Sequence, residues 1–356
     1  MLQIKVGTLA WKTLTMVGLC GEVPLPMFHS QKGCWDYWRR VITKLVRESY
    51  LREWKMKDGR GRVVRSLSLL PKGLEKLEEL TPNAAQWIRE KRLSSGPAYG
   101  DRDRAMRLHR NAWCFTVAGR MGAFWQPVDE KQDCLGRRAV YYGAYELNHT
   151  MGWDNKGSRL SGVFVDRDGW AWLLYYFGRS NMHWNSEVER GVRERLWDAL
   201  RGPDGRWYPC KIGGNILIAE DWTLVEELLH SGTSRYTKLF RLDRKVSSYC
   251  ITTDRDGVRL FQLLVDPDKQ IAFQQALYNT GLTRESRETR FLFSLEELRF
   301  FYQDAEIARR FFPPVEGLFL ECQREGIEKI NRGQTPIRLI SQQFWDAWWE
   351  NNKETF

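Results

Sequence analysis

The alternation of apolar and polar residues between positions 35 and 80 predicts one small basic domain. From Trp35 to Tyr50 the apolar residues recur three and four positions apart, so they share one face of a helix, and Arg and Lys fall largely on the other face. The sequence Tyr50–Lys57 alternates apolar and basic residues, which predicts a strand, and Val63–Leu69 is expected to be its partner. A closing helix is expected over Pro71–Leu80.

The turn between these two strands holds Asp58, Gly59, Arg60 and Gly61, which is typical of a β-hairpin. Cationic side chains on the helix and on the hairpin could neutralise phosphates and release counterions, which predicts contact with DNA. The alternative is a solvated hairpin whose charges keep an edge strand soluble. The residues expected to contact DNA are Arg39, Arg40, Thr43, Lys44 and Arg47 on the helix and Lys57, Arg60, Arg62 and Arg65 on the hairpin.

This order of elements, with LVRESYL at Leu45–Leu51 and LSLLPKGLEKL at Leu67–Leu77, resembles winged helix-turn-helix DNA-binding domains. The chain has Ser49 where that family usually has Gly, and Leu70 where it usually has Thr. The resemblance implies that the helix from Trp35 is the recognition helix and that the hairpin is the wing. The helix would enter the major groove, and the wing would contact phosphates or the adjacent minor groove. The segment TLTMVGLCG would then be the first helix and Val23–Ser30 a short second helix.

Charge is distributed unevenly along the 356 residues. Residues 1–120 contain 23 Lys and Arg against 11 Asp and Glu, a net charge of +12, so the rest of the chain carries −2 of the total of +10. This division favours a nucleic-acid-binding head on a nearly neutral body. The seven cysteines are scattered and contain no C-x-x-C spacing, which is typical of reduced cytosolic thiols. No signal peptide or membrane span is predicted, so the expected location is cytoplasmic.

The predicted domains are a winged-helix domain over residues 1–92, a linker over 93–103 rich in Ser, Gly and Pro, and a larger α/β domain over 104–356. The whole chain is therefore expected to be α+β. The second domain is predicted to contain a helix over 104–122, strands over 138–147 and 215–219, a hairpin over 160–177, and helices over 186–200, 223–230 and 268–279.

A second hairpin is predicted over Ser248–Val265, because Asp254–Gly257 repeats the D-R-D-G of Asp166–Gly169. Two explanations stay open, an internal duplication and turn chemistry that arose twice. From about residue 290 a helical extension is expected, beginning with a capping box of Ser294 and Glu297. The final stripe of Phe344, Trp345, Trp348 and Trp349 is expected to be core, with a helix that docks a partner protein as the alternative.

The first 230 residues also resemble, more faintly, the replication-relaxation proteins of plasmids and integrative elements. The place of their characteristic hairpin is taken here by Ser158–Phe164. This resemblance implies a role in replication, its control, or transcription of a mobile element. The expected function is therefore sequence-specific binding of double-stranded DNA, without a cofactor, by a protein that could form a homodimer.

Two other classes of function stay open. A metal-dependent nuclease would need carboxylates and Lys on the hairpin strands, but Ser161, Gly162 and Leu174–Phe177 stand there. No His-x-His or Walker A motif is present, and Asp166, Asp168, Asp254 and Asp256 are expected to form turns. His109 is expected to be a structural hydrogen-bonding residue. A ligand-sensing regulator is the other class, with a pocket lined by Trp153, Trp170, Trp172, Tyr175, Tyr176 and Trp184.

Overall fold

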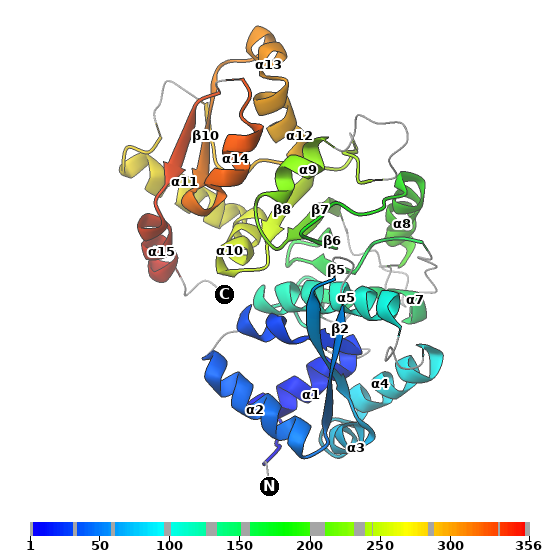
Figure 1. Ribbon diagram of the computed structural model, residues 1–356. Coiled ribbons are helices and arrows are strands. Elements are labelled where there is room, and N and C mark those ends of the chain that lie inside the picture. Colours follow the sequence, from blue (N-terminus) through cyan, green and yellow to red (C-terminus); the bar gives the residue numbers. More distant parts are fainter. Residues whose placement is uncertain are drawn as a thin grey trace. The chain divides into compact units, whose positions relative to one another are not determined.

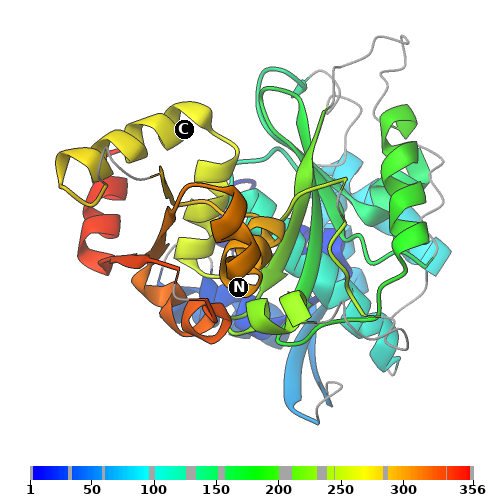
Figure 2. The same cartoon turned by 90° about the horizontal axis from the view of Figure 1, so that it is seen from above.

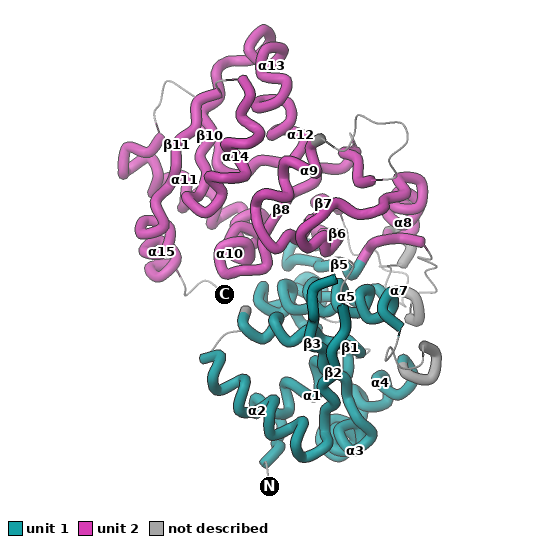
Figure 3. The backbone as a smooth tube through the Cα atoms, viewed as in Figure 1, with its two compact units in different colours: residues 1–154, 161–169, 198–209 teal, residues 155–160, 170–197, 210–356 magenta. Residues whose placement is uncertain are grey.

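The computed structural model describes residues 3–30, 34–57, 61–95, 101–125, 134–150, 157–199, 211–230, 239–243, 245–283, 288–333 and 335–352. The chain contains both helices and strands, which is consistent with the expected α+β class (Figure 1). The chain divides into two compact units, the first of residues 1–154, 161–169 and 198–209 and the second of residues 155–160, 170–197 and 210–356 (Figure 3). The expected boundary at 93–103 does not coincide with this division, because residues 104–154 belong to the first unit.

The first unit begins with a small antiparallel sheet and the helices that pack on it. The strands lie in the order β1-β3-β2, and the apolar residues of α1, α2 and α3 share one core with them. The hairpin of β2 and β3 extends away from these helices (Figure 2). In chain order the elements are α1 (Leu9–Cys20), β1 (Glu22–Pro24), the 3-10 helix η1 (Leu25–Ser30), α2 (Trp35–Arg47), β2 (Leu51–Lys57), β3 (Val63–Leu69), α3 (Pro71–Leu80), α4 (Pro82–Ser95) and α5 (Arg102–Arg120).

Most of the elements predicted here are confirmed, but the expected helix over Val23–Ser30 is wrong in its first residues. β1 pairs antiparallel with β3 instead, with Val23 opposite Leu67. The residues after β1 then form one short 3-10 helix. Pro24 and Pro26 explain why this segment forms no α-helix, because each lacks the amide hydrogen that a helix interior needs.

Helix α5 belongs with the sheet because it covers the sheet face that carries Trp54 and Met56. Ala105 of α5 packs against Met56, and Trp54, Val64 and Leu108 surround this contact. Helix α5 thereby removes from water apolar residues of β2 that would otherwise be exposed. This packing is the physical reason why the predicted linker over residues 93–103 does not separate α5 from the first domain.

A buried polar network also ties α5 to all three strands. Ser66 Oγ donates to Glu22 Oε2 at 2.8 Å, and Trp54 Nε1 donates to the same carboxylate at 3.0 Å. Since the single hydroxyl hydrogen of Ser66 is used in this way, His109 Nε2 donates to Ser66 Oγ at 2.9 Å. Burial, with a smaller contribution from Arg110, lowers the pKa of His109 from 6.5 to about 4. His109 is therefore a neutral structural residue, as its sequence context indicated.

The rest of the first unit consists of β4 (Val140–Gly143), α7 (Ala144–Thr150) and β5 (Gly162–Val165), with β4 and β5 antiparallel. The strand expected over 138–147 is thus half as long as predicted, and its second part is a helix. Gly162 packs closely here, because a Cβ at this position would lie 2.3 Å from the hydroxyl of Tyr141. That hydroxyl donates to the backbone oxygen of Ser161.

The second unit opens with a parallel sheet in which β7 pairs with both β6 and β8. The second half of β7, Ile216–Ala219, is continuously apolar and buried, as strands buried on both faces are. The helices expected after these strands are present. The elements are β6 (Trp170–Gly178), α8 (Ser186–Ala199), β7 (Lys211–Ala219), α9 (Leu224–His230), β8 (Ser248–Thr252), α10 (Arg255–Leu264) and α11 (Pro267–Asn279).

The predicted second hairpin over Ser248–Val265 is wrong. Strand β8 is followed by α10, and Asp254 caps this helix by accepting from the backbone N–H of Gly257 at 2.8 Å. Gly257 has no room for a side chain, since a Cβ there would lie 2.1 Å from the backbone oxygen of Thr252. At the first D-R-D-G, Asp166 accepts from the N–H of Asp168 in a turn between β5 and β6. The two tetrapeptides therefore have different structures and give no support to a duplication.

The expected helical extension from residue 290 also contains a second parallel sheet, in the order β11-β10-β9. The capping box of Ser294 and Glu297 is confirmed. The central strand of this sheet, VEGLFL, is buried along its whole length. The elements are β9 (Glu288–Arg290), α12 (Leu295–Leu298), the π-helical η2 (Arg299–Gln303), α13 (Ala305–Phe311), β10 (Val315–Leu320), η3 (Glu321–Gln323), α14 (Arg324–Ile330), β11 (Ile337–Ile340) and α15 (Gln342–Asn351).

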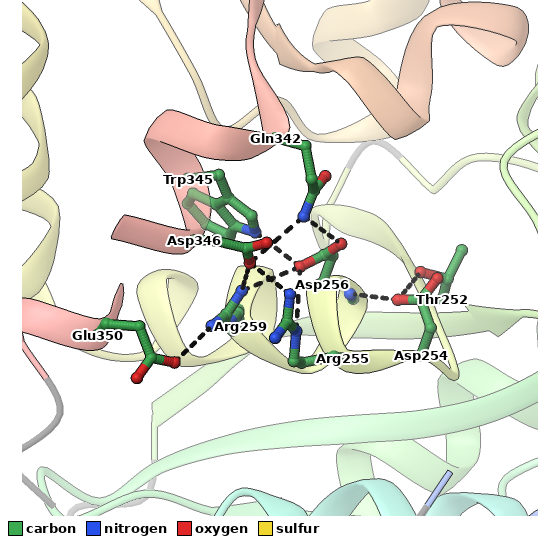
Figure 4. Close-up of polar contacts among 10 residues, drawn as sticks. Thr252, Asp254, Arg255, Asp256, Arg259, Gln342, Trp345, Asp346 and Glu350 are labelled. Atoms are coloured by element: carbon green, nitrogen blue, oxygen red, sulfur yellow. Dashed lines mark hydrogen bonds and ion pairs between the residues drawn. The ribbon is translucent and has the colours of Figure 1, made fainter. Parts of the chain in front are cut away.

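Helix α15 carries the tryptophan stripe, and Trp345, Trp348 and Trp349 are buried. A polar cluster fixes this helix against α10 (Figure 4). Arg259 Nη1 donates to Asp346 at 2.6 Å, and Trp345 Nε1 donates to Asp256 at 2.8 Å. The alternative that this stripe docks a partner protein is therefore wrong, because its indole rings already pack inside the second unit.

Candidate nucleic-acid interface

Helix α2 separates its buried and exposed residues cleanly. Trp38, Val41, Ile42 and Leu45 are buried in the core of the first unit. The five residues predicted to contact DNA are all exposed: Arg39, Arg40, Thr43, Lys44 and Arg47. The helical repeat of 3.6 residues explains the separation, because the two sets fall on opposite sides of the helix.

The cations of this exposed face are not used inside the protein. Within the ranges that the structure describes, the side chains of Arg39, Arg40, Lys44 and Arg47 have neither a hydrogen-bond nor an ion-pair partner. Four cationic side chains spread over about two and a half turns form a surface that could neutralise a phosphate backbone. We call the exposed residues of α2 together with the cations of β2 and β3 the basic face.

Tyr37 adds an aromatic ring to the basic face and was not among the predicted contacts. Its side chain is 60% exposed, and it lies three residues before Arg40 and seven before Lys44, on the same side of α2. A phenol so placed can stack on a base or donate a hydrogen bond to a phosphate. An exposed aromatic residue beside two basic positions was the signal that could have identified it.

The end of α2 sets the direction of the chain into the hairpin. Ser49 N–H donates to Val46 and Tyr50 N–H to Leu45, the two hydrogen bonds of a Schellman motif. Ser49 occupies the left-handed position of this motif with a φ of 61°. Winged helix-turn-helix domains, which this segment resembles, usually have Gly at this position, and Gly adopts this conformation without steric cost.

We therefore expect Ser49→Gly to raise the free energy of unfolding by about 1 kcal/mol, because it removes the steric cost of an L-residue in the left-handed region. Ser49→Ala retains the Cβ and should give no gain. Urea unfolding of both variants and the parent measures the difference. A variant Ser49→Gly that is less stable than Ser49→Ala would contradict the assignment of this strain.

The hairpin contributes fewer free cations than predicted. Arg65 is exposed but forms a two-pronged ion pair with Glu53 on the neighbouring strand, with Nη2 donating to Oε2 at 2.9 Å. Its charge is thus largely balanced. Lys57 and Arg62 are exposed, as predicted. Arg60 and the rest of the turn lie outside the described residues.

Lys55 was not predicted but belongs to the same surface. It lies directly opposite Arg65 in the register of β2 and β3, and it is exposed. Neither Lys55 nor Lys57 has a hydrogen-bond or ion-pair partner in the part of the chain that the structure describes. The alternation of YLREWKMK could have shown that Lys55 and Lys57 share one face of β2.

Three of the four carboxylates considered for a metal site have structural roles. Asp166 and Asp254 accept backbone hydrogen bonds, and Asp256 accepts from Trp345 and Gln342. Among the described residues, no three His, Cys, Asp or Glu side chains gather in a way that could hold a metal ion.

None of the helices in the described ranges is both long and apolar enough to cross a bilayer.

No protein-family model matches this chain, and comparisons with curated proteins and with solved structures found no match.

Proposed function

We propose that the first unit binds double-stranded DNA as a winged helix-turn-helix domain, with α2 as the recognition helix and the β2–β3 hairpin as the wing. The order helix, strand, short helix, helix, strand, strand supports this proposal, as does the antiparallel sheet in which β3 lies between β1 and β2. The net charge of +12 on residues 1–120 supports it independently.

One observation carries the proposal. Arg39, Arg40, Lys44 and Arg47 are exposed on one helix, and none has a partner among the described residues. Cations that only kept a surface soluble would be expected to alternate with acids or to form ion pairs, as Lys76 and Glu79 do on α3. The opposite face of α2 is packed in the core, so the helix presents these side chains in a fixed arrangement.

The chemistry of the basic face suggests a division of roles. Arg40, Thr43, Lys44 and Arg47 lie near the middle of the exposed face and would reach base edges in the major groove, where Arg recognises guanine and the Thr methyl group can contact thymine. Lys55, Lys57, Arg60 and Arg62 would contact phosphates beside this groove. Because Arg65 is bound to Glu53, we now assign it to stabilising the hairpin rather than to DNA contact.

A narrower role would be control of replication or transcription of a plasmid or another mobile element. This role follows only from the faint resemblance to replication-relaxation proteins. Palindromic operators bound by a homodimer would fit such control, and sedimentation of the full chain with and without DNA tests the dimer.

Fluorescence anisotropy of the full chain tests the proposal directly. Random duplexes and duplexes selected for binding are titrated across a salt series with Mg²⁺ present, and the DNA is inspected on a gel. We expect binding with a steep negative slope of log K against log salt, and intact DNA. Absence of binding would refute the proposal, and cleaved DNA would favour a nuclease instead.

The wing gives a separate prediction. Lys55→Ala with Lys57→Ala should weaken selected and random duplexes by the same factor and reduce the salt slope by about 2, because two phosphate contacts are lost. Lys76→Ala with Arg89→Ala removes the same charge from α3 and α4 of this unit and is the control. A loss confined to the selected duplex would show that these lysines contact bases.

A further inference from the structure

A cleft in the second unit has the size of a small-molecule site. Its volume is about 420 Å³, inside the range of roughly 300–1,000 Å³ in which proteins bind small ligands. Strands β6, β8 and β9, the end of α10, the face of α11 and the start of α12 surround it. The lining residues that carry the argument are Trp172, Tyr249, Gln274, Arg290, Phe291 and Glu297.

Aromatic side chains form part of the cleft wall, and two glycines on a neighbouring strand leave room for one of the rings. Gly213 and Gly214 of β7 lie beside Trp172, and a Cβ at Gly213 would lie 2.6 Å from the indole. A side chain at position 213 would therefore collide with this ring. Tyr249 meets Trp172 edge to face with ring centroids 6.2 Å apart. Trp172 is the one residue of the pocket predicted from sequence that lines the cleft. Trp170, Tyr175, Tyr176 and Trp184 do not line it, and Trp153 lies outside the described residues.

The rim of the cleft holds two opposite charges side by side. Arg290 Nη1 donates to Glu297 Oε1, and their side chains are 39% and 33% exposed. The capping box holds Glu297 in place, because its other oxygen accepts from Ser294 N–H at 3.0 Å. The pair is therefore fixed at the cleft while both groups still reach solvent.

We propose that this cleft binds a free aromatic amino acid. The aromatic side chain would lie against Trp172, Tyr249 and Phe291, the carboxylate would bind Arg290, and the ammonium group would bind Glu297. The amide of Gln274, which is exposed and has no partner within the described ranges, would complete the polar rim.

The charge of the rim discriminates among ligand classes. An aromatic acid without an amine would place its carboxylate next to Glu297, and an aromatic amine without a carboxylate would place its charge next to Arg290. A zwitterion presents one charge to each partner, so both repulsions are avoided. The aromatic walls in turn favour Phe or Tyr over small amino acids, because ring contacts supply the apolar burial.

Isothermal titration calorimetry of the full chain tests the proposal with five probes: L-phenylalanine, L-tyrosine, 3-phenylpropionate, phenethylamine and L-alanine. We expect the first two to bind and each of the other three to bind at least 10-fold more weakly. 3-Phenylpropionate and phenethylamine each lose a charged hydrogen bond, which costs roughly 10-fold or more, and L-alanine loses the burial of the ring. Equal binding of 3-phenylpropionate or phenethylamine would overturn the zwitterion assignment. No binding of L-phenylalanine or L-tyrosine would overturn the site.

Variants then place the ligand in this cleft. Arg290→Gln and Glu297→Gln should each weaken L-phenylalanine binding roughly 10-fold or more, and Gln at position 297 keeps the capping box that the helix needs. Arg310→Gln and Glu306→Gln change an exposed ion pair on α13 of the same unit and should leave binding unchanged. Circular dichroism confirms that each variant is folded. Gln274→Trp adds bulk at the exposed mouth of the cleft and should also weaken binding. If Arg290→Gln, Glu297→Gln and Gln274→Trp all leave binding unchanged, the ligand lies elsewhere.

Discussion

Arg40→Ala combined with Lys44→Ala is expected to lower the affinity of the full chain for a selected duplex roughly 100-fold, and for random duplexes roughly 10-fold. Each lost base contact costs about 1–3 kcal/mol, and each lost phosphate contact weakens all sequences alike. Both side chains are exposed and have no partner among the described residues, so the fold should be unaffected. Anisotropy titrations with both duplexes measure the two ratios.

The control for this experiment removes the same charge from the second unit. Arg324→Ala with Lys329→Ala changes two exposed cations on α14, and we expect less than a twofold effect on either duplex at physiological salt. If the control pair weakens binding as much as Arg40 and Lys44 do, attraction by net charge explains the affinity and α2 is not a recognition helix. Equal losses on selected and random duplexes would assign Arg40 and Lys44 to phosphates.

Acidification is expected to destabilise the first unit through His109. Its pKa is lowered from 6.5 to about 4 by burial, so the unfolded chain takes up a proton below pH 6.5 that the native chain accepts only near pH 4. The stability contributed by this residue is therefore present above pH 6.5 and is lost as the pH falls through this window. The loss is on the order of 3 kcal/mol over the whole window.

His109→Gln isolates this contribution, because the Gln amide can still donate to Ser66 Oγ but cannot take up a proton. We expect the difference in free energy of unfolding between parent and variant to shrink as the pH is lowered from 7.5 to 4.5, measured by urea unfolding followed by circular dichroism. His183→Gln, at an exposed position in the second unit, is the control for replacing a histidine. A difference between parent and His109→Gln that is constant with pH would contradict the buried neutral state.

The elements that sequence periodicity predicted best are those whose signals are local. The observed bounds of β3 and α3 coincide with the predicted ranges Val63–Leu69 and Pro71–Leu80. Alternation and a Pro in the first turn depend only on neighbouring residues. The exposure of all five α2 positions could be predicted for the same reason, since helical geometry alone decides which residues share a face.

The errors occurred where two structures satisfy the same local pattern. D-R-D-G forms a turn at Asp166 and begins a helix at Asp254, because Asp favours both a turn and an N-cap. Packing decides between them, since Gly257 fits against the backbone of β8. The three strands of the second parallel sheet were missed because each is short and pairs with residues far away in sequence.

The amino-acid sequence alone was sufficient to identify the basic third of the chain, its helix and hairpin, and the cations that α2 exposes, since charge and periodicity are properties of the chain itself. Only the tertiary structure showed that Arg65 is bound to Glu53, that α5 belongs with the first unit, and that Arg290 and Glu297 meet at an aromatic cleft. Each of these depends on contacts between segments separated in sequence. Such contacts are selected by packing and by the satisfaction of buried polar groups, which no local pattern records.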